Sequence, residues 1–517
     1  MTDLPKTAPD RYANYADYAD VIVIGGGVAG CAAALSAARR GASVVMLTKL
    51  PDPEEANTRY AQGGIIYTGP DDSPDLLARD ILDAGAWAGD PEAARLLARE
   101  GPPLVKRLLI NELSVPFDPD EPGFEGLHLT REGAHSVERI IHRHDTTGSA
   151  IQSRLTRAVH AEERISLLPG SHAASLAVEA GGRVVGVYAE YGGETVEIMG
   201  RSVVLATGGL GGLYSHTTNP PGATGDGIAL ATAAGARVRD LHYVQFHPTA
   251  LYTTGERFLV SEAVRGEGGV LRRPDGAEFV GHVLGSLAPR DVVARSIASM
   301  MQRTGSPCAY LDITSRSRHW LQDRFPAIFA RCMEDGVDPS REPIPVVPAA
   351  HYSCGGVATD ERGRTGVRGL WAAGEVARTG LHGANRLAST SLLEGLVWGW
   401  RSGEDAARPG AVPAGPLRPA GRTAPAPAPG EAGDLLRATM WEHAGLVRTG
   451  PGLETGLREL DGLEEEYGDT DLGAPLSVAR AILTGALEDR RSLGCHYRVD
   501  GGTPEAPEEA RVADLPG

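Results

Sequence analysis

Basic side chains lie in several short glycine-rich or apolar motifs: His247 in QFHPTA, Arg290 in LAPRD, His351 in HYSCGG and Arg386 in HGANRLAS. Arginine binds a carboxylate through two parallel hydrogen bonds, so these residue types indicate a site for an anionic substrate. Glu132, in HLTREGAHS, carries the opposite charge. A carboxylate that faced an anionic substrate would repel it, so Glu132 fits such a site only if the substrate also carries a positive group. Taken alone, each histidine is also compatible with a hydrogen-bonded core residue, and Glu132 with a surface or helix-capping acid.

A glycine-rich loop near the amino terminus indicates the binding of a nucleotide pyrophosphate. The segment ADVIVIGGGVAGCAAALSAARRGASVVMLTK reads as a strand, a glycine turn, an alanine-rich helix and a second strand. Gly25, Gly27 and Gly30 supply the GxGxxG spacing, which permits a tight turn, close approach of the backbone to phosphate, and close helix–strand packing. Thr48 and Lys49 replace the acidic residue that usually closes the second strand, so the motif does not establish NAD specificity.

Length and composition predict a globular protein of two or three domains. The chain has 517 residues, of which 42% are hydrophobic and 23% charged, and its formal net charge is −17. A field of this sign disfavours nucleic acid and anionic membrane surfaces. The five cysteines form no CxxC pair, which argues against a thiolate-bound metal and favours a reducing compartment. With no signal-peptide core and no apolar run of membrane-spanning length, we expect a cytoplasmic protein without a metal site.

Further motifs follow one another in a fixed order. They are NTRYAQGG at 57–64, ATGG at 206–209, QFHPTA at 245–250, LAPRDVVAR at 287–295, HYSCGG at 351–356, GLWAAGEV at 369–376 and HGANRLASTSLLEG at 382–395. This ordered set resembles the succinate dehydrogenase/fumarate reductase flavoprotein superfamily, and within it the L-aspartate oxidases. The resemblance is dense over residues 20–400 and thinner beyond them. It implies an FAD-dependent oxidoreductase.

The resemblance and the element pattern together predict an α/β protein. We expect a Rossmann-like FAD-binding domain, an inserted α+β capping domain and a C-terminal three-helix domain. The helical domain is expected because three amphipathic segments follow a proline- and alanine-rich stretch that has no packing pattern. The expected units are the FAD-binding domain at 19–245 and 345–405, the capping or substrate domain at 246–344, the linker at 406–433, the helical domain at 434–500 and a tail at 501–517.

The resemblance also implies which residues hold FAD. Lys49 would lie near the adenosine half, and residues 57–64 would enclose the flavin. Ser391 and Leu392 would open a helix whose positive end stabilises reduced flavin. Asn57 stands where membrane-linked relatives carry a histidine bonded to FAD, so we predict non-covalent FAD. The full cofactor set is Gly25, Gly26, Gly27, Val28, Ala29, Gly30, Lys49, Asn57, Thr58, Arg59, Tyr60, Ala61, Gln62, Gly63, Gly64, Asp226, Glu375, Ser391 and Leu392.

In the same superfamily, histidine and arginine side chains hold the two carboxylates of a C4 diacid. The residues that match here are His247, His351 and Arg386, and the pocket would be lined by Ser261 and Glu262. Arg290 matches the residue that moves a proton in the dehydrogenase relatives. A free arginine is a poor base because its pKa exceeds about 12, so clamping a carboxylate is the alternative role for Arg290.

The stretch around Glu132 distinguishes an amino-acid substrate from a plain diacid. TREGAHS resembles the TREGGHS of L-aspartate oxidases, with Ala134 in place of one glycine. Glu132 would then pair with the substrate ammonium, and either Glu132 or Arg290 would accept a proton. The implied reaction oxidises L-aspartate to iminosuccinate, with O₂ giving H₂O₂ or fumarate as electron acceptor. It is the first step of quinolinate and NAD biosynthesis, which implies a functional link to quinolinate synthase.

Other functions remain open from the sequence alone. The main alternative is a soluble fumarate reductase or succinate-oxidising flavoprotein, against which Asn57, Glu132 and Cys354 argue, since dehydrogenases commonly carry Met at the last position. A relative that hydroxylates the aspartate nitrogen would need NADPH, and no second dinucleotide motif is visible. A non-catalytic flavin-binding protein would have no need for the histidine and arginine set.

Overall fold

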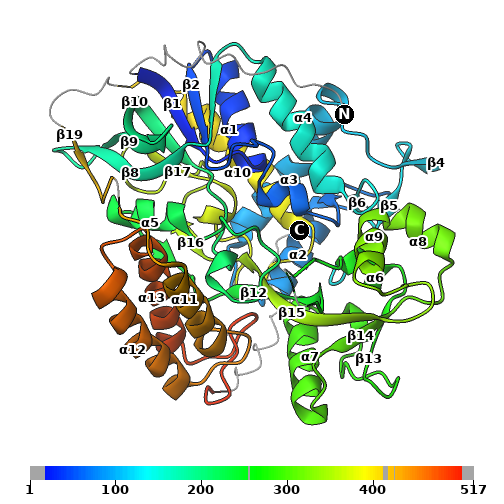
Figure 1. Cartoon of the computed structure of the whole chain (residues 1–517). Coiled ribbons are helices and arrows are strands. Elements are labelled where there is room, and N and C mark those ends of the chain that lie inside the picture. Colours follow the sequence, from blue (N-terminus) through cyan, green and yellow to red (C-terminus); the bar gives the residue numbers. More distant parts are fainter. Residues whose placement is uncertain (1–17, 254, 256, 411–416, 424, 503–517) are drawn as a thin grey trace, which may run out of the picture.

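The computed structural model describes residues 18–253, 255, 257–410, 417–423 and 425–502. Figure 1 shows strands with their covering helices at the top, a strand-and-helix group at the lower right, and three helices at the lower left. The predicted α/β fold is confirmed. The tail expected at 501–517 lies outside the described residues except for Gly501 and Gly502.

An eight-stranded sheet in the described part of the chain holds the glycine loop at the end of strand β1 (Tyr18–Ile24). β1 pairs in parallel with β2 (Val44–Thr48) and with β10 (Glu194–Leu205). Helix α1 (Val28–Arg39) connects β1 to β2, which confirms the predicted strand–helix–strand unit. The other strands are β7 (Ile165–Pro169), β8 (His172–Glu179), β9 (Val184–Tyr191), β17 (Leu370–Ala372) and β19 (Leu417–Pro419).

Small residues bring helix α10 (Thr390–Ala406) very close to α1. A Cβ on Gly399 would overlap the carbonyl oxygen of Ala29, and a Cβ on Gly403 would overlap that of Ala33. The side-chain-free glycines therefore let the two backbones touch. Because the contacts advance in the same direction along both helices, the amino-terminal ends of α1 and α10 lie at the same end of the pair.

A second layer covers α10 and supports the hairpin that contains Glu132. Its helices and the strands of its small sheet are rich in buried leucine, isoleucine and alanine. Strand β6 pairs antiparallel with both β3 and β5, so residues 131–139 form the loop of a hairpin. The elements are β3 (Ile65–Ile66), α2 (Pro74–Ala84), α3 (Pro91–Leu104), β4 (Pro119–Phe124), β5 (Leu129–Thr130), β6 (Ile140–Ile141) and α4 (Thr147–Ala161).

The group at the lower right of Figure 1 has a hydrophobic core of its own, centred on residues between Leu251 and Val346. A four-stranded antiparallel sheet forms this part, in the order β12–β15–β14–β13. The long strands β12 and β15 are almost wholly buried, and their ends reach the main body. The elements are β12 (Val244–Leu251), α6 (Glu262–Gly266), β13 (Val270–Arg272), α7 (Arg290–Thr304), β14 (Ala309–Asp312), α8 (Arg318–Arg324), α9 (Pro326–Glu334) and β15 (Ile344–Ser353).

The predicted three C-terminal helices are confirmed as α11 (Gly430–His443), α12 (Gly450–Tyr467) and α13 (Gly473–Glu488). Their leucines join the hydrophobic core beneath the main sheet, together with α5 (Asp226–Ala233). A three-stranded sheet of β11 (Val238–Arg239), β16 (Gly356–Ala358) and β18 (Ala377–Arg378) lies between the parts.

We expected residues 406–433, rich in proline and alanine, to be an unpacked linker. The described part of this segment instead contains a strand and the start of a helix. Residues 417–419 form β19, which pairs antiparallel with β8 at the edge of the main sheet. An edge strand tolerates proline because one row of its backbone groups has no partner. Helix α11 also begins inside the expected linker, at Gly430. Residues 411–416 and 424 lie outside the described residues.

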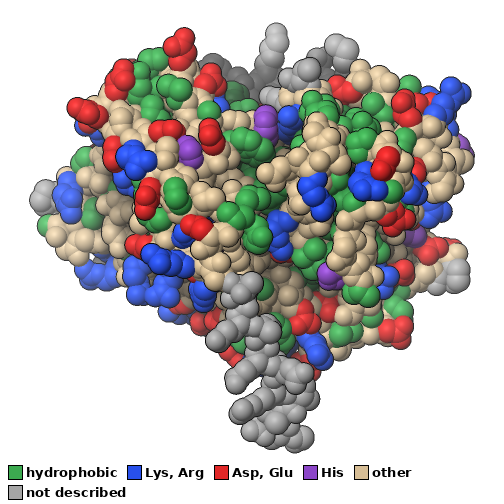
Figure 2. Space-filling view, turned by 90° about the horizontal axis from the view of Figure 1, so that it is seen from below, with side chains coloured by type: hydrophobic (Ala, Val, Ile, Leu, Met, Phe, Trp, Pro, Cys, Tyr) green, Lys and Arg blue, Asp and Glu red, His purple; other side chains and the backbone are tan. Residues whose placement is uncertain are grey.

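One face of the molecule mixes charges of both signs despite the negative total. On the face in Figure 2, acidic and basic side chains are interspersed, and Lys and Arg gather at its lower left. Across the residues that the structure describes, no helix has the length and apolarity needed to cross a membrane. The same residues contain no cluster of three or more His, Cys, Asp or Glu that could hold a metal ion.

Candidate active site

A cavity of about 1810 Å³, counting its open mouth, extends from the glycine loop to the basic residues. It brings together residues from β1, α10, β12, β15 and the segments between them. All the predicted substrate residues line it: Glu132, His247, Ser261, Glu262, Arg290, His351 and Arg386. Of the predicted cofactor residues, all except Gly30 and Arg59 line it as well.

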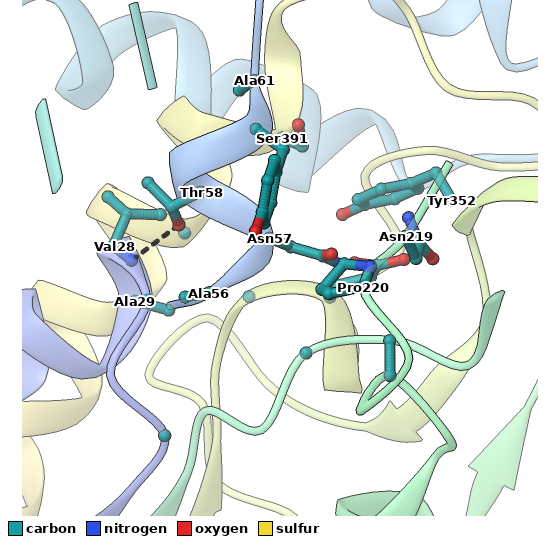
Figure 3. A pocket seen from close by; sticks show the side chains of 18 of the residues that line it. Val28, Ala29, Ala56, Asn57, Thr58, Ala61, Asn219, Pro220, Tyr352 and Ser391 are labelled. Carbon is teal, nitrogen blue, oxygen red and sulfur yellow. Dashed lines mark hydrogen bonds between the residues drawn. The ribbon is translucent and has the colours of Figure 1, made fainter. Parts of the chain in front are cut away.

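The glycine loop forms one end of the cavity. Gly25 has a φ of +116°, and a Cβ there would overlap the carbonyl oxygen of Ala206. A Cβ on Gly30 would overlap the carbonyl oxygen of Gly25, so Gly30 serves helix–strand packing and does not contact the cavity. The backbone N–H of Val28 donates to Thr58 Oγ1 at 3.0 Å (Figure 3), which ties the start of α1 to the 57–64 segment. This cradle of backbone N–H groups at a helix start suits a pyrophosphate.

Asn57 and Glu375 meet in the middle of the cavity. Asn57 Nδ2 donates to Glu375 Oε2 at 3.2 Å, and the backbone N–H of Ser353 donates to Oε1 at 3.0 Å. Burial raises the pKa of Glu375 to about 7, against the stabilising effect of the Ser353 N–H and of Arg386. The carboxylate therefore lacks the hydrogen bonds needed to offset its burial, and a ligand with hydroxyl groups would supply them.

The polar end beyond the glycine loop is held by an ion pair. Lys49 Nζ lies 2.7 Å from Asp226 Oδ2, and Thr224 Oγ1 donates to Asp226 Oδ1 at 2.6 Å. Although burial opposes it, contacts with His172 and Lys49 hold the pKa of Asp226 well below its usual range.

Arg59 does not face the cavity, contrary to the prediction that it encloses the flavin. Its guanidinium is bound to the carboxylates of Asp52 and Glu55 on the outer side of the 57–60 turn. A tight turn directs successive side chains to different sides, and the motif alone could not assign a side to each residue.

The lining of the cavity suits FAD in its polarity and in its exposed backbone. Buried atoms Gln62 Oε1 and Thr207 Oγ1, from residues that line it, have no hydrogen-bond partner within the described chain. Gly208, with φ +78°, has open space where a Cβ would lie, so the backbone there faces the cavity directly. Ser391 and Leu392, in the first turn of α10, line the middle of the cavity, where unpaired N–H groups of a helix start favour negative charge. The residues present can therefore hold the phosphates, the ribityl hydroxyls and an isoalloxazine ring.

Arg386 dominates the opposite end of the cavity. Its Nη1 donates to Ser391 Oγ at 2.9 Å, and its Nη2 to His351 Nε2 at 3.3 Å. The guanidinium lies over the ring of Tyr352, 4.4 Å from its centroid. Burial and the neighbouring Arg290 lower the pKa of Arg386 to about 10, which leaves it charged at neutral pH. Arg386 has no ion pair with a carboxylate among the residues that the structure describes, and such a buried guanidinium suits an anionic group of a ligand.

The two histidines have assignable tautomers. His247 Nδ1 accepts the backbone N–H of Thr249 at 3.2 Å, so its proton is on Nε2. His351 Nε2 accepts from Arg386, so its Nδ1 carries the proton and donates to Thr218 Oγ1 at 2.7 Å. Burial and the surrounding arginines lower the pKa of both histidines well below the usual value. Both rings are therefore neutral at pH 7, and they lie with centroids 5.0 Å apart.

Arg290 is part of a buried chain of charges. Its Nε donates to Glu262 Oε2 at 2.5 Å and its Nη1 to Gln245 Oε1 at 3.0 Å. Arg265 Nη2 lies 3.4 Å from the same oxygen of Glu262. Burial alone would raise the pKa of Glu262, but the two guanidiniums outweigh it and lower that pKa. Arg290, Glu262 and Arg265 thus form a row of buried charges that leads away from the cavity.

Glu132 faces into the cavity and is 4% exposed. Its Oε2 accepts a hydrogen bond from Ser389 Oγ at 2.5 Å. Burial and the charge of Glu262 raise its pKa, against the opposing effect of Arg290. It makes no ion pair within the described chain, so it can receive a cationic group from a ligand. The substrate-binding end thus offers a carboxylate alongside the guanidinium of Arg386.

Sequence reasoning missed several lining residues, including Tyr352, Ser389, Thr218, Asn219 and Pro220. Tyr352, Asn219 and Pro220 lie around the same space as Asn57 in Figure 3. Tyr352 adjoins His351 in HYSCGG, and Ser389 lies in the ASTSLL stretch. Tyr352 and Ser389 therefore could have been predicted from the motifs that contain them. The sequence TTNPPG, by contrast, gave no sign that residues 218–220 line the cavity.

Comparison with known proteins agrees with this geometry. A family model described as FAD binding domain matches residues 20–392. The chain is 45% identical to an L-aspartate oxidase of Halobacterium salinarum, over 95% of this chain and 98% of that protein. It is 44% identical to an L-aspartate oxidase of Mycobacterium tuberculosis, over 96% and 94%. Among solved structures, a mutant E. coli quinol fumarate reductase superposes with a TM-score of 0.85 at 28% identity, covering 96% of this chain and 93% of that one.

Proposed function

Because the chain belongs to the L-aspartate oxidase family, we propose that it oxidises L-aspartate to iminosuccinate with FAD as cofactor. The observation that carries this proposal is the pairing of opposite charges at one end of the cavity. Arg386 offers a guanidinium to a carboxylate, and Glu132, buried and without an ion-pair partner in the described residues, offers a carboxylate to an ammonium. A C4 diacid without an amine satisfies only the first of these.

Substrate binding follows from the hydrogen-bonding capacity of the site. Arg386 binds one carboxylate of aspartate, with His351 and Ser391 fixing the plane of the guanidinium. The Nε2–H of His247 donates to the other carboxylate, which a neutral imidazole can do without adding charge. Glu132 receives the ammonium. The substrate is thereby held at both ends and at Cα.

The reaction requires a neutral amine, because its lone pair forms the C=N bond as hydride leaves Cα. Burial raises the pKa of Glu132, which makes it a better acceptor for the ammonium proton than an exposed carboxylate. FAD, when bound, accepts the hydride and passes the electrons to O₂, giving H₂O₂, or to fumarate, giving succinate. Fumarate needs a proton at carbon as well, and Arg290 can deliver it with Glu262 and Arg265 as the relay.

We also propose that FAD is held without a covalent bond. Asn57 has no nucleophilic atom, and its amide is engaged with Glu375. Denaturation in acid should release all of the yellow colour into the supernatant. The five free, buried cysteines support action in the reducing cytoplasm. Iminosuccinate would there feed quinolinate and NAD biosynthesis, by way of a quinolinate synthase.

Anaerobic mixing of the holoenzyme with L-aspartate or with succinate tests the proposal. Aspartate should bleach the flavin, and succinate at equal concentration should leave it oxidised. Glu132→Gln should lower aspartate oxidation by about 10²- to 10⁴-fold, the usual contribution of a general base, and retain fumarate reduction. Bleaching by succinate as fast as by aspartate would instead favour the succinate-oxidising or fumarate-reducing alternative. The similarity to quinol fumarate reductase is the reason to test that alternative.

A further inference from the structure

The residue proposed to recognise the amine lies on a loop, not on a helix or strand. Residues 131–139 connect β5 to β6, and these two strands pair over only two residues each. A loop of this length is normally mobile unless other contacts fix it. Glu132 must nevertheless be fixed, because discrimination of an amine requires the carboxylate within hydrogen-bond reach of one atom.

A buried acid on helix α2 fixes the far side of this loop. Asp80, 4% exposed, accepts the backbone N–H of Ser136 at 2.9 Å and also the hydroxyl of Ser136. It further accepts Arg139 Nη1 at 2.6 Å. Arg139 is fully buried, and its Nη2 lies 2.9 Å from Asp72 Oδ1. Asp80 therefore joins both the middle and the end of the loop to α2.

Three further features define the path of the loop between Glu132 and Ser136. Ala134 has a φ of +66°, a left-handed conformation that costs a residue with a side chain about 1 kcal/mol relative to glycine. At Gly133 a Cβ would overlap Glu262 Oε1, so the backbone passes directly over that carboxylate. His135 Nε2 donates to the carbonyl oxygen of Ala388 at 3.0 Å. A strained path of this kind persists only where surrounding contacts hold it.

We propose that Asp80 is a positioning residue for substrate specificity, which holds the 131–139 loop so that Glu132 reaches the amine of the substrate. This inference rests on the proposed role of Glu132. The groups proposed to bind the carboxylates come from β12, β15, α7 and residues 386–391. The loop meets this set at Ala388 and Ser389, whereas the hydrogen bonds of Asp80 lie on the far side of the loop, at Ser136 and Arg139. Loss of Asp80 should therefore affect recognition of the amine and spare recognition of the diacid.

The measurement is the ratio of kcat/KM for aspartate oxidation to kcat/KM for fumarate reduction, taken on the FAD-loaded full chain. In Asp80→Asn we expect this ratio to fall at least about tenfold, the loss of a charged hydrogen bond. In Ser136→Ala, which keeps Asp80 and Arg139 intact, we expect a fall of about threefold. If Asp80→Asn does not fold, Ser136→Ala alone decides, and an unchanged ratio there overturns the proposal.

Asp72→Asn is the matched control. Asp72 binds the same buried arginine as Asp80, yet the structure shows no hydrogen bond from it to residues 132–136. Its substitution should lower stability while leaving the ratio within twofold of the starting protein. If Asp72→Asn lowers the ratio as much as Asp80→Asn, the effect is general destabilisation and the inference fails.

Glu132→Gln, measured in parallel, separates this inference from the proposed function. A large fall in the ratio for Glu132→Gln with none for Asp80→Asn and Ser136→Ala overturns the positioning role alone. An unchanged ratio for Glu132→Gln overturns the role of Glu132 itself, and the positioning role with it.

Discussion

Replacing Glu375 by glutamine should abolish a pH dependence in the binding of FAD. Glu375 is buried at the middle of the cavity, where it accepts hydrogen bonds from the Ser353 N–H and the Asn57 amide. Its pKa is raised from 4.5 to about 7, a difference of about 2.5 units. At about 1.4 kcal/mol per unit, ionising this carboxyl in the empty site costs about 3 kcal/mol.

The sign and size of the effect on FAD follow from that value. Ligand hydroxyls that donate to Glu375 prefer the carboxylate, so FAD binds the ionised form and affinity falls as pH drops through about 7. For a pKa of about 7, the apparent Kd rises about tenfold between pH 8 and pH 6. The same linkage applies to stability: with its folded pKa raised, the group contributes stability below about pH 4.5, and this is lost as pH rises through about 7.

The assay is titration of the FAD-free protein with FAD at pH 6, 7 and 8, followed by quenching of flavin fluorescence. Glu375→Gln should bind with one affinity across the range, and its FAD-free form should be more stable than the starting protein at pH 8. Glu394 and Arg386 are the other charged groups that influence Glu375, and both remain in the variant, so it isolates this one carboxyl. Equal FAD affinity of the starting protein at pH 6 and pH 8 would refute the reasoning.

Three further outcomes are expected. Tyr352→Leu should weaken succinate binding about 30-fold, because it removes a buried cation–π contact of about 2 kcal/mol with Arg386. Tyr352→Phe keeps the ring and should weaken binding less than about fivefold. Equal losses of affinity for the two variants in a flavin-difference titration would exclude the contact. Succinate affinity should decline above about pH 10, where Arg386 loses its proton, and a flat profile to pH 11 would contradict the lowered pKa. Gly30→Ala should lower the melting temperature and the FAD content of the purified protein, since its Cβ would overlap the carbonyl oxygen of Gly25; a fully loaded, equally stable variant would show that the loop can shift.

The parts of the fold that follow a local rule could be predicted from the sequence. The β1–α1–β2 unit was readable because strand, glycine turn and helix are contiguous, and the C-terminal helices because their apolar residues recur at helical spacing. Strand β19 could not be predicted from the sequence, because its pairing with β8 depends on a sheet edge some 240 residues away in the chain and not on local propensity. Arg59 was assigned to the wrong side of its turn for a related reason: a motif gives residue order but not direction.

In the candidate site, too, local motifs could be predicted from the sequence and contacts between distant segments could not. Residues in motifs, such as Arg386 and His247, were found by type and spacing, and the structure brings them to one cavity. No motif could predict the contacts that hold these side chains in place. Examples are the stacking of Arg386 on the Tyr352 ring and the hydrogen bond from the Glu132 loop to Asp80. These contacts join segments tens to hundreds of residues apart, and they leave no periodic trace in either segment.

The arrangement of the site also explains how one cavity can serve a diacid and an amino acid. Arg386, which we propose clamps a carboxylate, is bonded to Ser391 in the first turn of α10, so the proposed clamp and the proposed floor of the flavin site are directly connected. Glu132 instead belongs to a hairpin loop whose conformation is strained at Ala134 and maintained by contacts with α2. The proposed amine-binding and diacid-binding groups therefore lie on different segments, which meet where Ser389 donates to Glu132 and His135 contacts Ala388. We therefore expect a change on the α2 side of the loop to act mainly on the amine, and a change in α10 to act on cofactor and substrate together.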